Sequence, residues 1–144
     1  MSQISSNAAK TLLAGLIAVL GLLGFQAGAV FAAVPAKAPA IAQAPCGDTS
    51  GFEKVNLSQL PPEAKDTVDL IKSGGPFPYP QDGQTFTNRE GILPKCDSAY
   101  YKEYTVKTPG SDDRGPRRFV VGAKGEYFYT EDHYESFKLT NING

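Results

Sequence analysis

Hydrophobic and polar residues are distributed very unevenly along the 144-residue chain. Residues 11–34 are almost entirely apolar, and the first 45 residues contain no acidic side chain and only two basic ones, Lys10 and Lys37. Charged and aromatic residues are concentrated after residue 45. This break in composition predicts a targeting segment that is followed by one small folded domain.

Within residues 46–144, the spacing of apolar residues predicts one helix followed by several strands. Leu60–Ala64 has the prolines and the acid typical of a first helical turn, Val68 and Ile71 extend one apolar face, and Ser73–Gly75 ends the helix. One helix before a run of strands predicts an α+β fold, with the helix packed on a single antiparallel sheet of about five strands. Alternation with period two is found over residues 101–107, 117–121, 126–130 and 134–140.

The apolar N-terminal segment has the features of a secretory signal peptide. Lys10 precedes an apolar stretch over residues 12–25, and small residues suited to cleavage follow at Ala29 and Ala32. We therefore assign residues 1–32 to a signal peptide and residues 33–45 to an extended Ala/Pro linker. The domain would then be extracellular and free of the membrane. The alternative is a retained anchor, because the apolar run approaches the ~20 residues that a membrane span needs.

Two cysteines, Cys46 and Cys96, in an exported domain predict one disulfide bond. It would close a loop of about fifty residues and stabilise the fold by roughly 4 kcal/mol. Two free thiols are the alternative. A metal site is a weaker interpretation still, because the chain has a single histidine, and we expect neither a metal nor another cofactor.

The net charge restricts how the domain could bind a nucleic acid. Fourteen basic residues less Lys10 and Lys37 leave twelve against fifteen acids, so the net charge after residue 45 is near −3. A protein that attracts nucleic acid through its overall field should be basic. Contact with RNA would therefore need a local basic cluster, and Arg114, Arg117 and Arg118 are the candidates.

Three kinds of side chain in this domain could together cleave RNA through the ribose 2′-hydroxyl. That reaction needs a general base, a general acid and cations that stabilise the charge on phosphorus. Glu103 lies with Thr105 on one face of a predicted strand, His133 lies in a turn before another, and Arg118 lies on the face opposite to Arg117. Each of these residue types alone more often has a structural role. Their relative positions in the fold must therefore decide whether they form a catalytic site.

Several stretches between Leu60 and Leu139 carry a resemblance to a known family. In order and spacing they resemble the bacterial guanyl-specific ribonucleases, the superfamily of barnase, and above all its small secreted actinobacterial members. The resemblance covers about eighty of the ninety-nine residues after residue 45. The matching stretches are Leu60–Ala64, Gly75–Gly83, Phe86–Glu90, Glu103–Val106, Thr108–Gly110, Arg114–Arg118 and Asp132–Tyr134.

The resemblance implies a role for each residue of the catalytic set. Glu103 falls on the family's general base and His133 on its general acid. Arg114 and Arg118 fall on the arginines that bind the scissile phosphate, and Tyr134 falls on a tyrosine whose hydroxyl also reaches it. The implied reaction gives a 2′,3′-cyclic phosphate, which water then opens.

The resemblance also implies a guanine site in the loop 86–90. Phe86 would pack on the base, backbone amides of Thr87, Asn88 and Arg89 would address O6, and the Glu90 carboxylate would accept hydrogen bonds from N1–H and the 2-amino group. Guanine alone offers a carboxylate two adjacent donors, and a wrong base would leave that acceptor unpaired.

The chain departs from the family pattern in a few positions. Thr87 stands where close relatives carry glutamine, Pro80 and Pro116 stand where they carry serine, threonine or alanine, and Cys96 lies in a loop instead of near the C terminus. The resemblance implies a monomer that acts on single-stranded RNA and is held by a small acidic inhibitor of the barstar type. The alternatives are an RNA-binding module of the same fold without turnover, and a membrane-anchored surface protein.

Overall fold

The computed structural model of the protein describes residues 42–144. The predicted signal peptide and most of the predicted linker lie outside these residues. No helix among residues 42–144 is long and apolar enough to cross a membrane. The elements, in chain order, are β1 (Glu53–Asn56), the 3-10 turn η1 (Leu57–Gln59), α1 (Pro62–Ser73), β2 (Tyr101–Thr105), β3 (Arg118–Gly122), β4 (Tyr127–Thr130) and β5 (Lys138–Asn141).

The helix forms where the sequence predicts it. Pro62 occupies its first turn and Glu63 follows, so a missing amide hydrogen costs nothing there and an acid faces the positive end of the helix. Gly74 ends the helix in a left-handed conformation, with φ of 78°, and its amide donates to carbonyl oxygens of the last turn. Ala64 and Val68 are completely buried on one face of α1.

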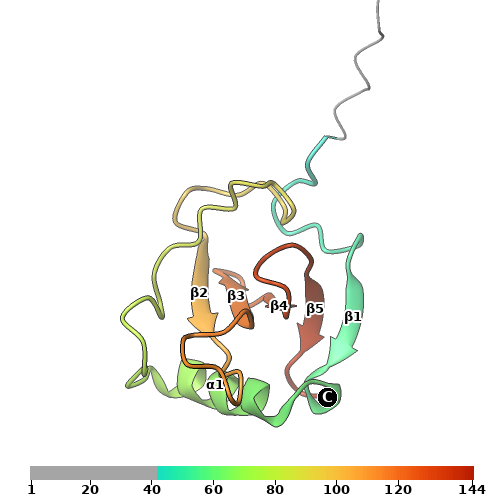
Figure 1. The fold of residues 1–144 in the computed structure, drawn as a ribbon. Coiled ribbons are helices and arrows are strands. Elements are labelled where there is room, and N and C mark those ends of the chain that lie inside the picture. The colour runs from blue at the N-terminus through green and yellow to red at the C-terminus, as the bar shows by residue number, and fades with distance from the viewer. Residues whose placement is uncertain (1–41) are drawn as a thin grey trace, which may run out of the picture. The chain divides into compact units, whose positions relative to one another are not determined.

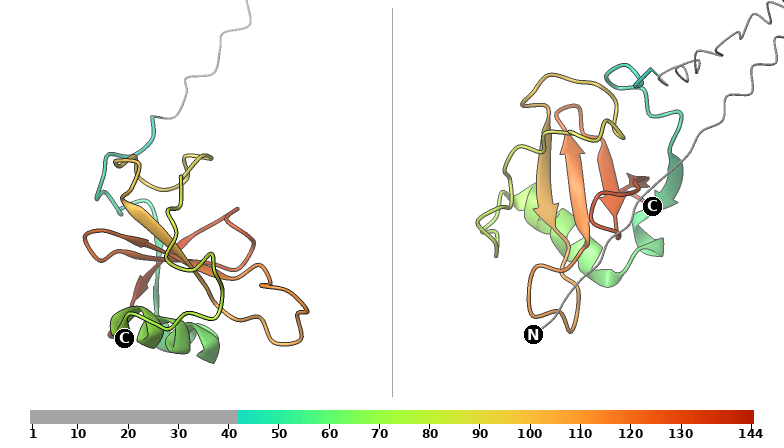
Figure 2. Two further views of the ribbon diagram at one scale, coloured as in Figure 1. Left: turned by 90° about the vertical axis from the view of Figure 1, so that its left-hand side faces the viewer. Right: turned by 45° about the horizontal axis from the view of Figure 1, so that its top comes forward.

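Five strands form one sheet in the order β1-β5-β4-β3-β2, and α1 packs against it (Figures 1 and 2). The pairs β2–β3, β3–β4 and β4–β5 are antiparallel, which confirms the α+β prediction. The sheet is nevertheless mixed and not wholly antiparallel, because β1 pairs parallel with β5. The prediction missed β1 because this short edge strand has mostly exposed side chains. The predicted strand 134–140 is also shorter in the structure, since β5 begins only at Lys138.

Side chains of the strands alternate between two apolar clusters, one on each face of the sheet. The cluster beneath α1 contains Phe119 and Tyr129 together with Ala64 and Val68. The cluster on the opposite face is centred on Val120 and also contains Leu93, Tyr101, Phe128 and Phe137. The helix therefore covers one face, and long loops before β2 and after β4 cover part of the other.

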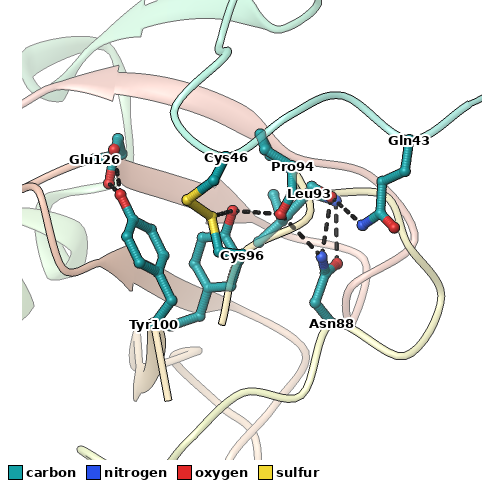
Figure 3. Close-up of a disulfide and its surroundings, with 9 residues drawn as sticks. Gln43, Cys46, Asn88, Leu93, Pro94, Cys96, Tyr100 and Glu126 are labelled. Carbon is teal, nitrogen blue, oxygen red and sulfur yellow. Dashed lines mark hydrogen bonds between the residues drawn. A yellow bond between two sulfur atoms is a disulfide. The ribbon is translucent and has the colours of Figure 1, made fainter. Parts of the chain in front are cut away.

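The predicted disulfide is confirmed, because Cys46 is bonded to Cys96 (Figure 3). The N-terminal segment also contacts the loop before β2 through its backbone: the Lys95 amide donates to the Ala44 carbonyl at 2.8 Å, and Pro45 forms a parallel bridge with Lys95. Ala44 and Pro45, at the end of the predicted linker, are therefore paired with the domain. The sequence could not indicate this, because these hydrogen bonds use backbone groups that every residue has.

Candidate active site

The strand-borne residues of the predicted site share the sheet face that α1 leaves uncovered. Glu103 on β2 is opposite Val120 on β3, and Thr105 is opposite Arg118. Because side chains alternate along a strand, Glu103, Thr105 and Arg118 lie on the same face. Arg117 points the other way, and its guanidinium lies 3.7 Å from the Glu63 carboxylate on α1. Of the arginine cluster, Arg117 is therefore outside the site.

Arg118 is a buried cation, with 3% of its surface exposed. Its Nη1 donates to the carbonyl oxygens of Gly115 and Arg117, each at 2.7 Å, and to that of Arg114 at 3.3 Å. These bonds fix the guanidinium, while its Nε has no partner among the described residues. A guanidinium fixed in this way is a positioned cation that can stabilise the charge of a phosphate.

Arg114 is positioned by polar groups that meet at Thr105. Its Nε donates to the Thr105 hydroxyl at 3.0 Å, and its Nη2 lies 3.9 Å from the Asp82 carboxylate. Asp82 also accepts a hydrogen bond from the Thr105 amide at 2.7 Å. The Arg114 guanidinium lies over the Tyr79 ring, 5.9 Å from its centroid. Sequence reasoning missed Asp82, which it identified only as part of a turn.

His133 and Tyr134 lie in the loop after β4, and both have positive φ, 58° and 74°. Such values cost backbone energy in residues other than glycine, so neighbouring contacts must hold them. Asp132 supplies part of this support by accepting hydrogen bonds from Thr130 and from Ser136. Burial raises the pKa of Asp132, but these hydrogen bonds outweigh burial and the pKa is lowered overall. Sequence reasoning missed this role of Asp132 as well.

The Tyr134 hydroxyl joins the loop to the strand by donating a hydrogen bond to the Glu103 carboxylate. The Arg118 guanidinium lies over the Tyr134 ring, 6.0 Å from its centroid. Burial, followed by the bond to Glu103 and its negative charge, raises the pKa of Tyr134 to about 12. Tyr134 therefore stays a neutral donor at physiological pH, with the Glu103 carboxylate at its hydroxyl and the Arg118 guanidinium over its ring.

A cavity of about 610 Å³ lies beside this cluster. On one side of it the Phe86 ring stacks on Tyr134, with ring centroids 5.0 Å apart. The predicted substrate-binding residues line it, with the exception of Asn88, and so does His133. The predicted residues Glu103, Arg114 and Arg118 do not line it, whereas Ile92 and Glu135, which sequence reasoning missed, do. Its lining residues are Phe86, Thr87, Arg89, Glu90, Ile92, His133, Tyr134 and Glu135.

Asn88 has a different position from the other predicted base-contacting residues. Its φ of 51° is left-handed, and its side chain turns inward to bond the backbone of Leu93 and Pro94. The side chain of Asn88 therefore holds the loop together. Only its backbone amide could address a base.

The arrangement brings together a carboxylate, an imidazole, two guanidinium groups and a cavity with an aromatic wall. A carboxylate and an imidazole can exchange protons with a substrate, and guanidinium groups can stabilise a pentavalent phosphorus. The described residues contain no group of three or more histidine, cysteine, aspartate or glutamate side chains that could hold a metal ion.

The fold and this site define a ribonuclease of the microbial type, and comparison with known proteins agrees. A family model described as ribonuclease matches residues 43–141. The chain belongs to this family.

The relatives of the chain are small ribonucleases from actinobacteria. Guanyl-specific ribonuclease St from Saccharopolyspora erythraea is 72% identical over 101 residues, which are 70% of this chain and all of that protein. Guanyl-specific ribonuclease Sa from Kitasatospora aureofaciens is 57% identical over 93 residues, 64% of this chain and 95% of that protein.

Solved structures of ribonuclease Sa2 share the fold. Its structure in complexes with mononucleotides matches with a TM-score of 0.63 and 46% identity, over 65% of this chain and 97% of that chain. Its structure with guanosine-2′-cyclophosphate matches with a TM-score of 0.61 and 45% identity, over 65% and 99%.

Proposed function

We propose that the domain is an endoribonuclease that cleaves single-stranded RNA on the 3′ side of guanosine. Glu103 takes the proton from the ribose 2′-hydroxyl, and the 2′-oxygen attacks phosphorus. The bond to the 5′-oxygen breaks, and His133 protonates that leaving group. The product is a 2′,3′-cyclic phosphate, which water opens with the two proton-transfer roles reversed.

One observation carries the proposal. The Tyr134 hydroxyl donates to the Glu103 carboxylate and the Arg118 guanidinium lies over the Tyr134 ring, beside a cavity that His133 and Glu90 help to line. Arg118 is buried, so its charge acts on phosphorus through a medium of lower dielectric than water. Arg114 would add a second cation from the turn before β3.

Guanine specificity is proposed for the cavity wall formed by residues 86–90. The exposed Glu90 carboxylate would accept from N1–H and the 2-amino group, and Phe86 would pack on the base. Two relatives are named guanyl-specific ribonucleases, and ribonuclease Sa2 was solved with a guanosine cyclic phosphate, which supports this specificity. If the contact made by residue 87 uses its backbone amide, Thr87 serves as well as the glutamine of close relatives.

The test is digestion of a defined single-stranded RNA by the purified protein in EDTA, with the product ends identified. Fragments that end in guanosine 2′,3′-cyclic phosphate would support reaction class and specificity together. Replacement of either proton-transfer residue, by Glu103→Gln or His133→Gln, should lower the rate about 10²- to 10⁴-fold and leave the fold intact. Glu53→Gln, at an exposed glutamate on the opposite edge strand, is the matched control.

Wild-type rates in Glu103→Gln or His133→Gln would refute these assignments. No cleavage by the folded, disulfide-bonded protein would favour the binding-module interpretation. Cleavage without base preference would contradict the proposed role of the loop 86–90.

Export to the extracellular space is also proposed, with residues 1–32 as the signal peptide. The mass of the exported form would distinguish this from a retained anchor. We further propose that the domain is a monomer, and that a barstar-like acidic inhibitor protects the cell that makes it. Copurification from the producing cell would test for this inhibitor.

A further inference from the structure

The loop that would bind guanine has few buried anchors. Thr87, Arg89 and Glu90 are exposed, and the loop contacts the core only at its two ends, through the half-buried Phe86 and through the fully buried Leu93 and Pro94. Within the loop, the Asn88 carboxamide donates to the Leu93 carbonyl at 2.9 Å and accepts from the Leu93 amide at 3.1 Å. The loop therefore closes on itself through one side chain and one backbone hydrogen bond, from the Gly91 amide to the Asn88 carbonyl.

A second support comes from outside the loop, from a residue far away in sequence. The Gln43 Nε2 donates to the same Leu93 carbonyl at 2.6 Å, so that two amides converge on one oxygen (Figure 3). The Gln43 carboxamide also lies against Gly91, where an added Cβ would meet it at 3.5 Å. Gln43 thus contacts the backbone on both sides of Ile92, the last loop residue that lines the cavity.

The position of Gln43 is itself fixed. Its neighbour Ala44 pairs with the Lys95 amide, and Cys46 is bonded to Cys96, next in the chain. The glutamine therefore extends from an anchored backbone, and holding it in place costs less conformational entropy than it would at a free terminus.

We infer that Gln43 is a positioning residue for the base-binding loop: it holds Gly91–Leu93 in place, and so fixes the backbone amides and the carboxylate that read the base. This inference rests on the proposed function. A site that distinguishes bases by a few hydrogen bonds needs its groups held within about 0.5 Å, and a loop that must be ordered on binding weakens affinity. Gln43 touches no reacting group of the proposed mechanism, so it acts on binding and not on the chemical step.

The experiment measures steady-state cleavage of guanylyl-(3′,5′)-uridine and its adenylyl counterpart by the full domain with Gln43→Ala or Gln43→Glu. Each change removes one donor, so KM for the guanine substrate should rise roughly two- to tenfold while kcat changes less than about twofold. The preference for guanine should fall by the same factor. The glutamate variant keeps the size of the side chain and its contact with Gly91. If it raises KM as much as Gln43→Ala does, the effect comes from the lost Nε2 donor and not from the lost contact.

Gln59→Ala is the matched control. The Gln59 side chain also makes one hydrogen bond to the backbone, to the Asn56 amide at 2.9 Å, but it does so at η1. It should leave KM and base preference unchanged. Asn88 still donates to the Leu93 carbonyl in the Gln43 variants, so they should fold.

Amide hydrogen exchange of residues 87–95 supplies a measurement that does not depend on activity. Exchange there should be faster in both Gln43 variants and unchanged in Gln59→Ala. Unchanged exchange, unchanged KM, or a fall in kcat alone would overturn the inference. If the wild type shows no guanine preference, the proposed function fails, and the exchange rates still decide whether Gln43 holds the loop.

Discussion

Removal of the Cys46–Cys96 disulfide should lower the stability of the domain by a calculable amount. The two cysteines are 50 residues apart. Closing a loop of that length removes chain entropy worth about 4 kcal/mol from the denatured state at 25 °C. For a domain of about 100 residues, an unfolding entropy near 0.2 kcal/mol/K converts this loss into a fall in Tm of about 20 °C.

The assay is urea denaturation of the wild type and of the Cys46→Ser/Cys96→Ser variant, followed by far-UV circular dichroism, since the chain contains no tryptophan. The slope of the unfolding free energy against urea should increase, because an unlinked chain exposes more surface. The variant should still fold, because backbone bonds such as that from Lys95 to Ala44 do not depend on the sulfurs.

The alanine pair, Cys46→Ala/Cys96→Ala, is the control for the chemistry of the substituted residues. Cys96 is half-buried and lies beside the Tyr101 hydroxyl, 3.5 Å from its Sγ, so serine there could form a new hydrogen bond. If the serine and alanine double variants lose the same free energy of unfolding, the effect comes from the missing cross-link. A loss below about 1 kcal/mol in both would refute the chain-entropy reasoning, since the denatured chain would then already keep these segments together.

Three further substitutions test single contacts. Glu90→Ala should reduce the preference for guanine over adenine in dinucleotide cleavage more than it slows cleavage of the adenine substrate; a preserved preference would contradict the role of this carboxylate. Arg118→Ala should lower the unfolding free energy by about 2–3 kcal/mol in urea, because backbone carbonyls lose their buried donor; an unchanged midpoint would show that water replaces the guanidinium. The folded pKa of Asp132 is below its ordinary value of 3.8, so its ionisation stabilises the fold above that pH and this contribution is lost as pH falls through the folded pKa. Asp132→Asn should therefore be less stable than the wild type at pH 7, and in urea titrations the difference in unfolding free energy should shrink below about pH 4. A difference that does not depend on pH would show that ionisation of Asp132 is not its cause.

The periodicity of the sequence predicted the parts of the fold that depend on local contacts. It placed the helix to within two residues at its start, and it put Glu103 and Thr105 on one sheet face with Tyr104 on the other. It also separated Arg117 from Arg118. These predictions succeed because a strand turns successive side chains to opposite faces wherever it lies in the sheet.

The assignment of roles within the site came from resemblance and not from periodicity. A glutamate, a histidine and an arginine are common surface residues, and nothing in their spacing shows that they meet. Asp82 and Asp132 were missed for the same reason, because each acts by accepting hydrogen bonds from residues that the fold brings to it.

By itself, then, the sequence determined an α+β domain with one helix, four of its five strands and the oxidised pair Cys46–Cys96. Only the tertiary structure decided that β1 pairs parallel with β5, that Tyr134 bonds Glu103, and that Gln43 reaches the Leu93 carbonyl. The physical reason is that hydrophobic patterns report which way a side chain faces. Pairing between distant segments depends on backbone hydrogen bonds that all residues can make, and on how the chain closes in three dimensions.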